Sequence, residues 1–250
     1  MEPSLYTLIT GASSGLGRAA AIRLSGERGL ILHGRNLERL EETRRLCESP
    51  DRHVLWPFEL RNVAELAASL APLLAQSGRA VTAFVHCAGM VTVLPMRSID
   101  HRVAQEIMNV NFFSAVEIVN LLLRKKINNH RLTDILFISS ISSQFGARGF
   151  SSYCASKAAL DGLMRALAVE LAPAIRANSI LPGAIRTSMA AESFADPSTI
   201  ENLDRDCPMG IGRPEDIADA IEFVLSGKAR WLTGQQIVVD GGRTVNMSLK

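Results

Sequence analysis

The chain has 250 residues, a hydrophobic fraction of 47% and a formal net charge of +2. This length is sufficient for one sizeable core, and the dispersed charges give no broad basic field that would attract nucleic acid or an anionic membrane. The first residues lack a charged leader followed by a long apolar region, and the four cysteines are far apart. We therefore expect one cytoplasmic domain over residues 1–250 that binds no nucleic acid, membrane or metal.

Short apolar runs alternate with longer segments of helical periodicity along the chain. The runs predict strands at residues 5–9, 30–33, 53–58, 81–85, 135–138, 178–181 and 236–239. The intervals predict helices at residues 15–25, 36–48, 62–76, 101–126, 152–172 and 214–226. Strands without strict alternation, separated by helices, are typical of a parallel sheet covered on both faces.

This alternation predicts the α/β class: a single-domain Rossmann fold whose doubly wound, mostly seven-stranded parallel sheet is flanked by helices. A long irregular stretch is expected from about residue 182 to 208. Because it follows a strand end, we expect its part at about 187–208 to form a lid over a substrate.

A glycine-rich turn follows the first predicted strand, where the sequence reads TGASSGLG from Thr10 to Gly17. A nucleotide pyrophosphate needs backbone N–H groups, a helix N-terminus and no side chain in the way. The spacing is GxxxGxG and not the common GxGxxG. The interpretation as a nucleotide-binding turn therefore depends on its position directly after a strand. The turn predicts these cofactor-binding residues: Gly11, Ser13, Ser14, Gly15, Leu16 and Gly17.

The second predicted strand ends in His33-Gly34-Arg35-Asn36, with no carboxylate before Glu38. At this place an acidic residue usually binds the ribose 2′-hydroxyl of NAD, and a basic residue accommodates the 2′-phosphate of NADP. Arg35, with Asn36 beside it, therefore favours NADP over NAD. The alternative is a solvated arginine at the start of a helix.

Tyr153 and Lys157 lie four positions apart in a predicted helix, so they share one of its faces. A neighbouring ammonium group favours a phenolate, and we expect Lys157 to lower the pKa of Tyr153 from about 10. Tyr153 could then exchange a proton with a substrate oxygen. The alternative is an ordinary amphipathic tyrosine near a helix start.

Together these motifs resemble the main branch of the short-chain dehydrogenase/reductase family, including its 3-oxoacyl-[acyl-carrier-protein] reductase-like members, over nearly the whole chain. The resemblance implies a catalytic Ser140, thirteen positions before Tyr153, and a catalytic Asn111. Simple structural roles, a turn serine and a mid-helix asparagine, are the alternatives. The PG motif of the family implies four further cofactor contacts, at Pro182, Gly183, Ile185 and Thr187.

Two segments depart from the family pattern. The usual NNAG reads His86-Cys87-Ala88-Gly89, which removes two asparagine side chains that brace the central sheet. The usual aspartate after the third strand is replaced by Glu59. The resemblance still implies cofactor contacts at Glu59, Leu60, Cys87, Ala88 and Gly89.

The resemblance implies reduction of a ketone or aldehyde with NADPH. Tyr153 would donate the proton, Ser140 would bind the developing alkoxide, Lys157 would hold the nicotinamide ribose, and Asn111 would connect Lys157 to solvent through water. The tyrosine-to-lysine spacing favours carbonyl over enoyl reduction. The alternatives are an NAD-dependent secondary-alcohol dehydrogenase and a non-catalytic nucleotide-binding regulator.

The substrate is expected to be a small carbonyl or alcohol compound, with 3-oxoacyl thioesters among the candidates. We expect a homotetramer or a homodimer, because the predicted helices at 101–126 and 152–172 have more apolar surface than one sheet face covers. The five histidines show no ligand or triad spacing and are expected to have no chemical role.

Overall fold

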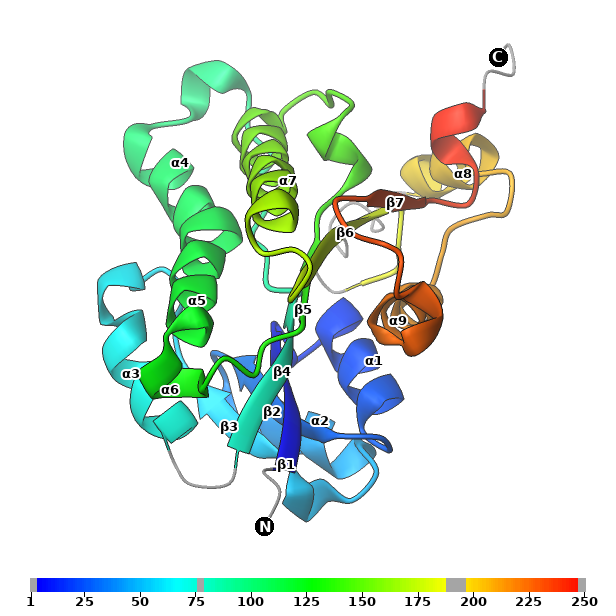
Figure 1. The fold of residues 1–250 in the computed structure, drawn as a ribbon. Coiled ribbons are helices and arrows are strands. Elements are labelled where there is room, and N and C mark those ends of the chain that lie inside the picture. The colour runs from blue at the N-terminus through cyan, green and yellow to red at the C-terminus, as the bar shows by residue number, and fades with distance from the viewer. Residues whose placement is uncertain (1–3, 76–78, 188–196, 247–250) are drawn as a thin grey trace.

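The computed structural model describes residues 4–75, 79–187 and 197–246. In this part of the chain, seven strands form one parallel sheet in the order β3-β2-β1-β4-β5-β6-β7. The strands are β1 (Ser4–Thr10), β2 (Gly29–Gly34), β3 (Val54–Pro57), β4 (Arg79–His86), β5 (Asp134–Ile138), β6 (Arg176–Pro182) and β7 (Gln236–Val239). Helices lie on both sides of this sheet (Figure 1), which confirms the predicted Rossmann-type fold.

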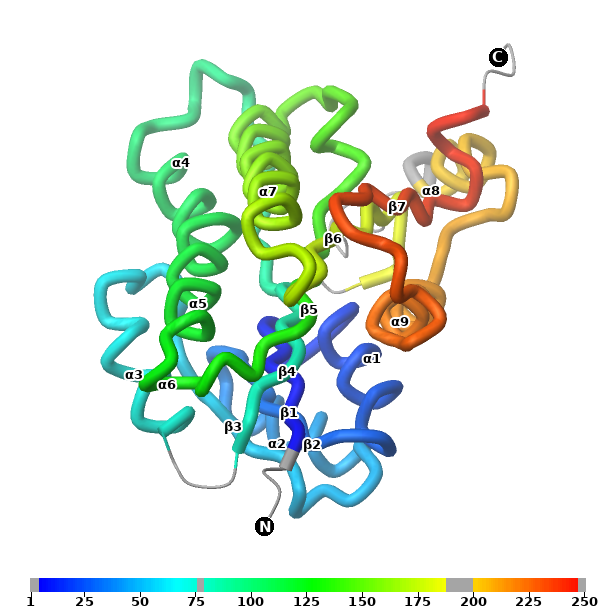
Figure 2. The backbone as a smooth tube through the Cα atoms, viewed as in Figure 1, coloured from blue at the N-terminus to red at the C-terminus, as the bar shows by residue number. Residues whose placement is uncertain are grey.

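Two helical layers enclose the sheet. One contains α1 (Gly15–Leu24), α2 (Leu37–Leu46) and α9 (Pro214–Leu225), and the other contains α3 (Val63–Ala75), α4 (His101–Met108), α5 (Ser114–Leu123), α6 (Lys125–Asn128) and α7 (Ser151–Glu170). Figure 2 shows these two layers apart, with α3, α5 and α7 on the left of the sheet and α1 and α9 on the right.

Each layer has its own hydrophobic core, because successive residues of a strand point to opposite faces. In β1, Leu8 packs into the core under α3, α5 and α7, whereas Ile9 packs into the core under α1 and α9. In β4, Phe84 and Val85 are divided in the same way. Burial on both faces explains why these strands are continuously apolar.

The single helix predicted at residues 101–126 is interrupted, so that prediction is wrong in its continuity. A π turn (Asn109–Phe113) separates α4 from α5, and an extended Arg124 separates α5 from α6. The hydroxyl of Ser114, the first residue of α5, donates to the carbonyl oxygen of Val110 in the π turn at 2.8 Å. Such turns add one residue to a helix and often occur at functional sites.

Among the described residues, the run His101–Leu123 is long and apolar enough to cross a bilayer by length and composition alone. Its α5 part packs against α3 and the π turn, and Ile118, Leu121 and Leu122 are buried in the protein core. This packing is that of a core helix in a folded domain.

The predicted lid region has more regular structure than we expected. Residues 188–196 lie outside the described residues, and α8 (Pro197–Asp206) occupies much of the rest. The sequence did not predict this helix because its apolar face is narrow. From residue 200 to residue 206 only Ile200 and Leu203 are apolar, and they are followed by the buried Cys207.

The strand order reverses between β1 and β4, which are neighbours in the sheet. In a doubly wound sheet, the chain leaves the two strands on either side of such a point in opposite directions, which opens a crevice at their carboxyl ends. The glycine turn after β1 and the segment after β4 therefore meet there, and the loops after β5 and β6 follow along the same edge.

Candidate active site

Tyr153, Lys157 and Ser140 come together at the carboxyl edge of the sheet. Tyr153 and Lys157 lie in the first two turns of α7, and the Lys157 Nζ is 5.8 Å from the centre of the Tyr153 ring. Ser140 follows β5, and its side chain lies close enough to the Tyr153 phenol to influence the pKa of that group. A phenol, a hydroxyl and an ammonium group are thus concentrated where the crevice of this fold opens.

Lys157 is a buried cation, with 3% of its surface exposed. Its Nζ donates to the carbonyl oxygen of Ile138 at 2.8 Å, at the end of β5. Burial lowers the pKa of Lys157 to about 8, and the negative charge of Asp161 one turn later opposes this shift. The ammonium group is therefore held in place at the strand end, with its charge maintained in part by Asp161.

The expected lowering of the Tyr153 pKa does not occur in this structure. Burial raises the pKa of Tyr153, and the nearby Ser140 side chain opposes the rise without cancelling it. Lys157 directs its Nζ toward the backbone of Ile138, so it does not offset the burial. Tyr153 consequently holds its proton through neutral pH, which is the form that a proton donor requires.

Asn111 lies in the π turn and is completely buried. Its Oδ1 accepts from the Met90 backbone N–H at 2.7 Å, and its Nδ2 donates to the Met90 carbonyl at 2.9 Å and to the Ser156 Oγ at 2.8 Å. These bonds use both amide protons. A water relay through Asn111 would therefore have to use its backbone carbonyl, while its side chain positions the start of α7.

The glycine turn has the close backbone packing that a phosphate site requires. A Cβ on Gly17 would collide with the carbonyl of Gly11, and a Cβ on Gly11 would lie 2.9 Å from the Ala88 backbone. Gly11 also has a φ of 71°, in the left-handed region that favours glycine. A side chain at Gly17 would force the turn away from α1, and one at Gly11 would force it away from the segment after β4.

The N-terminus of α1 fits an anionic group. Ser14 is the N-cap residue, but its side chain makes no capping hydrogen bond, and the first turn has no acidic residue. Ser13, Gly15 and Leu16 are partly exposed around it. The first N–H groups of a helix lack partners within the helix and carry partial positive charge, so this terminus could hold the pyrophosphate of a dinucleotide.

Two histidines that were expected to have no chemical role brace this turn. The His33 Nδ1 accepts from the Gly11 N–H at 3.3 Å, so its Nε2 carries the proton and donates to the Phe58 carbonyl at 3.1 Å. His33 thereby joins the glycine turn to the end of β3. Burial lowers the pKa of His33 to about 4, so the ring is neutral.

His86 occupies the first asparagine position of the family's NNAG motif. The Thr10 Oγ1 accepts from the Ala88 N–H at 3.2 Å and lies within hydrogen-bond distance of the His86 Nδ1, at 2.9 Å. Burial lowers the pKa of His86 to about 3. The imidazole therefore ties β1 to β4, a bracing role that the sequence comparison had treated as lost.

The adenosine side of the site contains an ion pair that sequence reasoning missed. The Arg35 Nη1 lies 3.5 Å from the Glu59 Oε2, across the ends of β2 and β3. Asn36 caps α2, with its Oδ1 accepting from the Arg39 N–H at 2.9 Å. Leu60 is buried in the core, so only its backbone could contact a cofactor.

The remaining predicted cofactor residues follow β4 and β6. Cys87, Ala88 and Gly89 continue from β4, and burial raises the pKa of the Cys87 thiol to about 12, so it is an unreactive thiol. Pro182 ends β6, and Gly183 donates its N–H to the Val239 carbonyl at 3.0 Å.

The loop after β6 reaches the glycine turn. Ile185 is buried and forms a bridge with Gly212. A Cβ on Gly15 would lie 3.5 Å from the side chain of Thr187, so these two predicted cofactor residues face each other. The described residues contain no group of three or more side chains that could hold a metal ion.

Comparisons with known proteins agree with this geometry. A sequence-family model described as enoyl-(acyl carrier protein) reductase matches residues 11–244. The (3R)-3-hydroxyacyl-CoA dehydrogenase of Homo sapiens is 31% identical, over 96% of this chain and 95% of that protein. The 3-oxoacyl-[acyl-carrier-protein] reductase of Rickettsia felis is 34% identical, over 94% of this chain and 95% of that protein.

Solved structures extend the similarity. A 4-hydroxyisoleucine dehydrogenase complexed with NADH has a TM-score of 0.88 and 26% identity, over 96% of this chain and 99% of that chain. A chain from Agrobacterium tumefaciens with bound NADP has a TM-score of 0.87 and 25% identity, over 96% of both chains. Chains of this fold thus bind either dinucleotide.

Proposed function

The chain belongs to the short-chain dehydrogenase/reductase family, and from this premise we propose that it is a cytoplasmic, NADP(H)-dependent oxidoreductase that reduces a ketone or an aldehyde. The observation that carries the proposal is the cluster of Tyr153, Ser140 and Lys157 at the carboxyl edge of the sheet, the edge at which the glycine turn also lies. The nicotinamide, when bound, supplies a hydride to the carbonyl carbon.

The residues of the chain then handle the oxygen and its proton. Ser140 donates a hydrogen bond to the developing alkoxide, and Tyr153 transfers its proton to that oxygen. Lys157, fixed on the Ile138 carbonyl, would hold the nicotinamide ribose. Asn111 keeps the start of α7 in position through Ser156.

The cofactor would lie across the strand reversal between β1 and β4. The N-terminus of α1 would hold the pyrophosphate, Arg35 the 2′-phosphate, and the loop containing Ile185 and Thr187 the nicotinamide carboxamide. The direct test is a panel of carbonyl compounds that includes 3-oxoacyl thioesters and keto sugars, with NADPH and NADH oxidation followed in parallel. Oxidation of NADPH by at least one compound is expected.

A secondary-alcohol dehydrogenase that uses NAD is the second candidate. The pairing of Arg35 with Glu59 favours it, because the carboxylate partly neutralises the guanidinium that would bind the 2′-phosphate. Inactivity of every carbonyl compound with NADPH, combined with reduction of NAD by secondary alcohols, would replace the first candidate with the second.

NADPH is expected to bind more tightly than NADH, and Arg35→Ala is expected to remove most of the difference. A charge-assisted bond contributes about 1.5–3 kcal/mol, and the exposure of Arg35 argues for the lower part of that range, or roughly tenfold in affinity. Dissociation constants of both cofactors, measured at one ionic strength, decide the matter.

Arg45→Ala provides the matched control, because Arg45 is an exposed arginine in the last turn of α2. An acid introduced at Gly34 is a poorer test. A Cβ there would lie 3.0 Å from the Ser13 side chain, so the glycine turn would have to shift. Equal affinity of the unmodified protein for NADH and NADPH would show that Arg35 does not select the cofactor.

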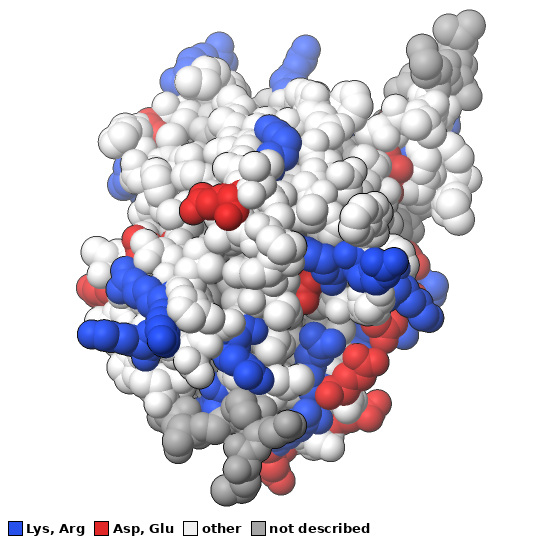
Figure 3. Space-filling model, viewed as in Figure 1, with Lys and Arg blue, Asp and Glu red and all other residues white. Residues whose placement is uncertain are grey.

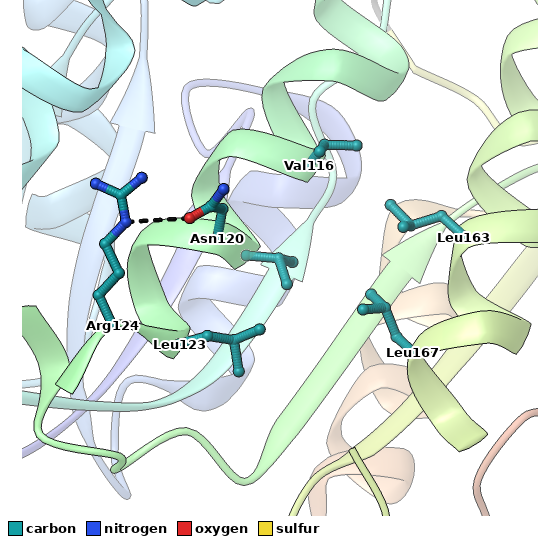
Figure 4. Close-up of a pocket in the computed structure, with 7 residues that line it drawn as sticks. Val116, Asn120, Leu123, Arg124, Leu163 and Leu167 are labelled. Carbon is teal, nitrogen blue, oxygen red and sulfur yellow. Dashed lines mark hydrogen bonds between the residues drawn. The ribbon is translucent and has the colours of Figure 1, made fainter. Parts of the chain in front are cut away.

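We also propose that the protein forms a homotetramer or a homodimer through an apolar groove between α5 and α7. The groove has a volume of about 340 Å³. Figure 4 shows its lining side chains, which are Val116, Val119, Asn120, Leu123, Arg124, Leu163 and Leu167. The surface over α7 has few charged groups (Figure 3). A second copy related by a two-fold axis would cover the same residues on both chains.

Light scattering at micromolar concentration is expected to give a mass of two or four chains of 27.1 kDa. Leu163→Glu is expected to lower that mass, because it places a charge in the apolar groove between the two helices. Arg165→Glu, at an exposed position of the same helix outside the groove lining, is the control. A monomeric unmodified protein would refute the proposal.

A further inference from the structure

Glu59 is held beside Arg35 by the way in which two strands end together. Gly34 and Pro57 are paired at the ends of β2 and β3, and the Phe58 N–H donates to the Gly34 carbonyl at 3.0 Å. The His33 Nε2 donates to the Phe58 carbonyl from the same side. The residues that follow, Arg35 and Glu59, therefore leave neighbouring strand ends whose separation is fixed by hydrogen bonds.

The carboxylate is the partner of this ion pair that is also bonded to the backbone and the less exposed of the two. The Glu59 Oε1 accepts from the Arg61 N–H at 3.1 Å, and its Oε2 lies 3.5 Å from the Arg35 Nη1. The Glu59 side chain is 33% exposed, whereas the Arg35 side chain is 66% exposed. A ligand that arrives at the guanidinium therefore meets a negative charge already anchored to the backbone.

This arrangement affects the two cofactors differently. A 2′-phosphate carries negative charge and must share Arg35 with the carboxylate, whereas a 2′-hydroxyl is neutral and a carboxylate can accept its hydrogen bond. Charges within about 4 Å at a partly exposed site interact strongly enough to change affinity by roughly tenfold. A prediction that considers Arg35 without Glu59 therefore overestimates the preference for NADP over NAD.

We propose that Glu59 is a specificity-determining residue that competes with the 2′-phosphate for Arg35 and thereby limits the preference for NADP over NAD. The inference rests on the proposed placement of the adenosine ribose beside Arg35. The negative charge of Glu59 disfavours the 2′-phosphate and so limits the difference in affinity between NADP and NAD. The same site could then use both dinucleotides.

The test measures binding of fragments that report only on this end of the cofactor. Adenosine 2′,5′-bisphosphate and adenosine 5′-monophosphate are titrated by calorimetry into the full-length protein and into Glu59→Gln, at one ionic strength. The variant is expected to bind the bisphosphate about five- to tenfold more tightly and the monophosphate within twofold of the unmodified protein. Unchanged or weaker binding of the bisphosphate would overturn the proposal.

Two further variants separate competition for Arg35 from a general effect of charge. Glu41→Gln removes the same charge from an ion pair on α2, where Glu41 lies 2.8 Å from Arg44, and it is expected to leave bisphosphate binding within twofold. In an Arg35→Ala background, Glu59→Gln is expected to lose most of its gain. A full gain in that background, or an equal gain from Glu41→Gln, would contradict the proposal.

The test of competition by Glu59 can fail or succeed independently of the test of the proposed function. The preference of the unmodified protein between NADPH and NADH tests the assignment of the cofactor. The change caused by Glu59→Gln in bisphosphate binding tests the competition. A protein without cofactor preference whose Glu59→Gln variant gains bisphosphate affinity would disprove the former and support the latter.

Discussion

Tyr153→Phe is expected to abolish turnover while NADPH binding stays within about twofold of the unmodified protein. The substitution deletes the hydroxyl that would protonate the substrate oxygen, and the remaining ring still fills its place beside Phe150. A positioned proton donor contributes about a hundredfold to ten-thousandfold to a rate, so a loss of that size is expected. Steady-state rates on any accepted carbonyl compound, with NADPH fluorescence titrations alongside, provide the measurement.

The chain supplies its own control, because Tyr6 is its other tyrosine. Its hydroxyl donates to the Arg52 carbonyl at 3.2 Å, and Tyr6 lies early in β1, away from the strand ends that form the site. Tyr6→Phe is therefore expected to retain turnover within about twofold. A Tyr153→Phe variant with rates within a few-fold of the unmodified protein would exclude Tyr153 as the proton donor.

The protein is expected to lose stability steeply as the pH falls from 6.5 toward 4. Burial lowers the pKa of His33 to about 4 and of His86 to about 3, from an ordinary value of 6.5. Below pH 6.5 the unfolded chain binds protons that the folded chain does not, so the stabilisation is complete above 6.5 and declines below it. Each histidine approaches a slope of about 1.4 kcal/mol per pH unit.

Together the two histidines would remove roughly 5 kcal/mol between pH 7 and pH 4.5, which is comparable with the total stability of many domains. Urea unfolding followed by circular dichroism at a series of pH values, at one protein concentration, measures this slope. His86→Asn is expected to reduce the slope of unfolding free energy against pH by about 1.4 kcal/mol per pH unit, since an amide side chain does not titrate. His130→Asn, at an exposed position, is expected to leave it unchanged. An unaltered slope in His86→Asn would show that His86 does not contribute to the loss of stability at low pH.

The fold could be predicted because its signals are local and agree with one another. The run Leu30-Ile31-Leu32 is buried on both faces of a central strand, and such a run between two helical segments admits few structures other than a parallel sheet. The spacing between Tyr153 and Lys157 likewise predicts a shared helix face, and the structure places them in successive turns of α7.

The differences arise where long-range contacts override local periodicity. Asn111 is drawn to the backbone of Met90, twenty-one residues earlier, and no helical pattern at residues 101–126 contains that information. The roles of His33 and His86 depend on which strands are neighbours in the sheet. The pKa of Tyr153 is set mainly by its burial in the folded protein. The spacing of Tyr153 and Lys157 in the sequence reveals neither this burial nor the bond from Lys157 to Ile138.

The π turn at Asn109–Phe113 also places α4 and α5 in different angular registers. Each residue of an α-helix turns the chain by about 100°, so deleting one residue from this turn would rotate all of α5 relative to α4. The rotation would carry Val116 and Leu123 out of the groove that they line, in the same step that withdraws Asn111 from Met90. A deletion of one residue would thus disturb both the groove through which we propose that copies of the chain assemble and the residues that we propose act in catalysis, although the groove and the active site share no side chain.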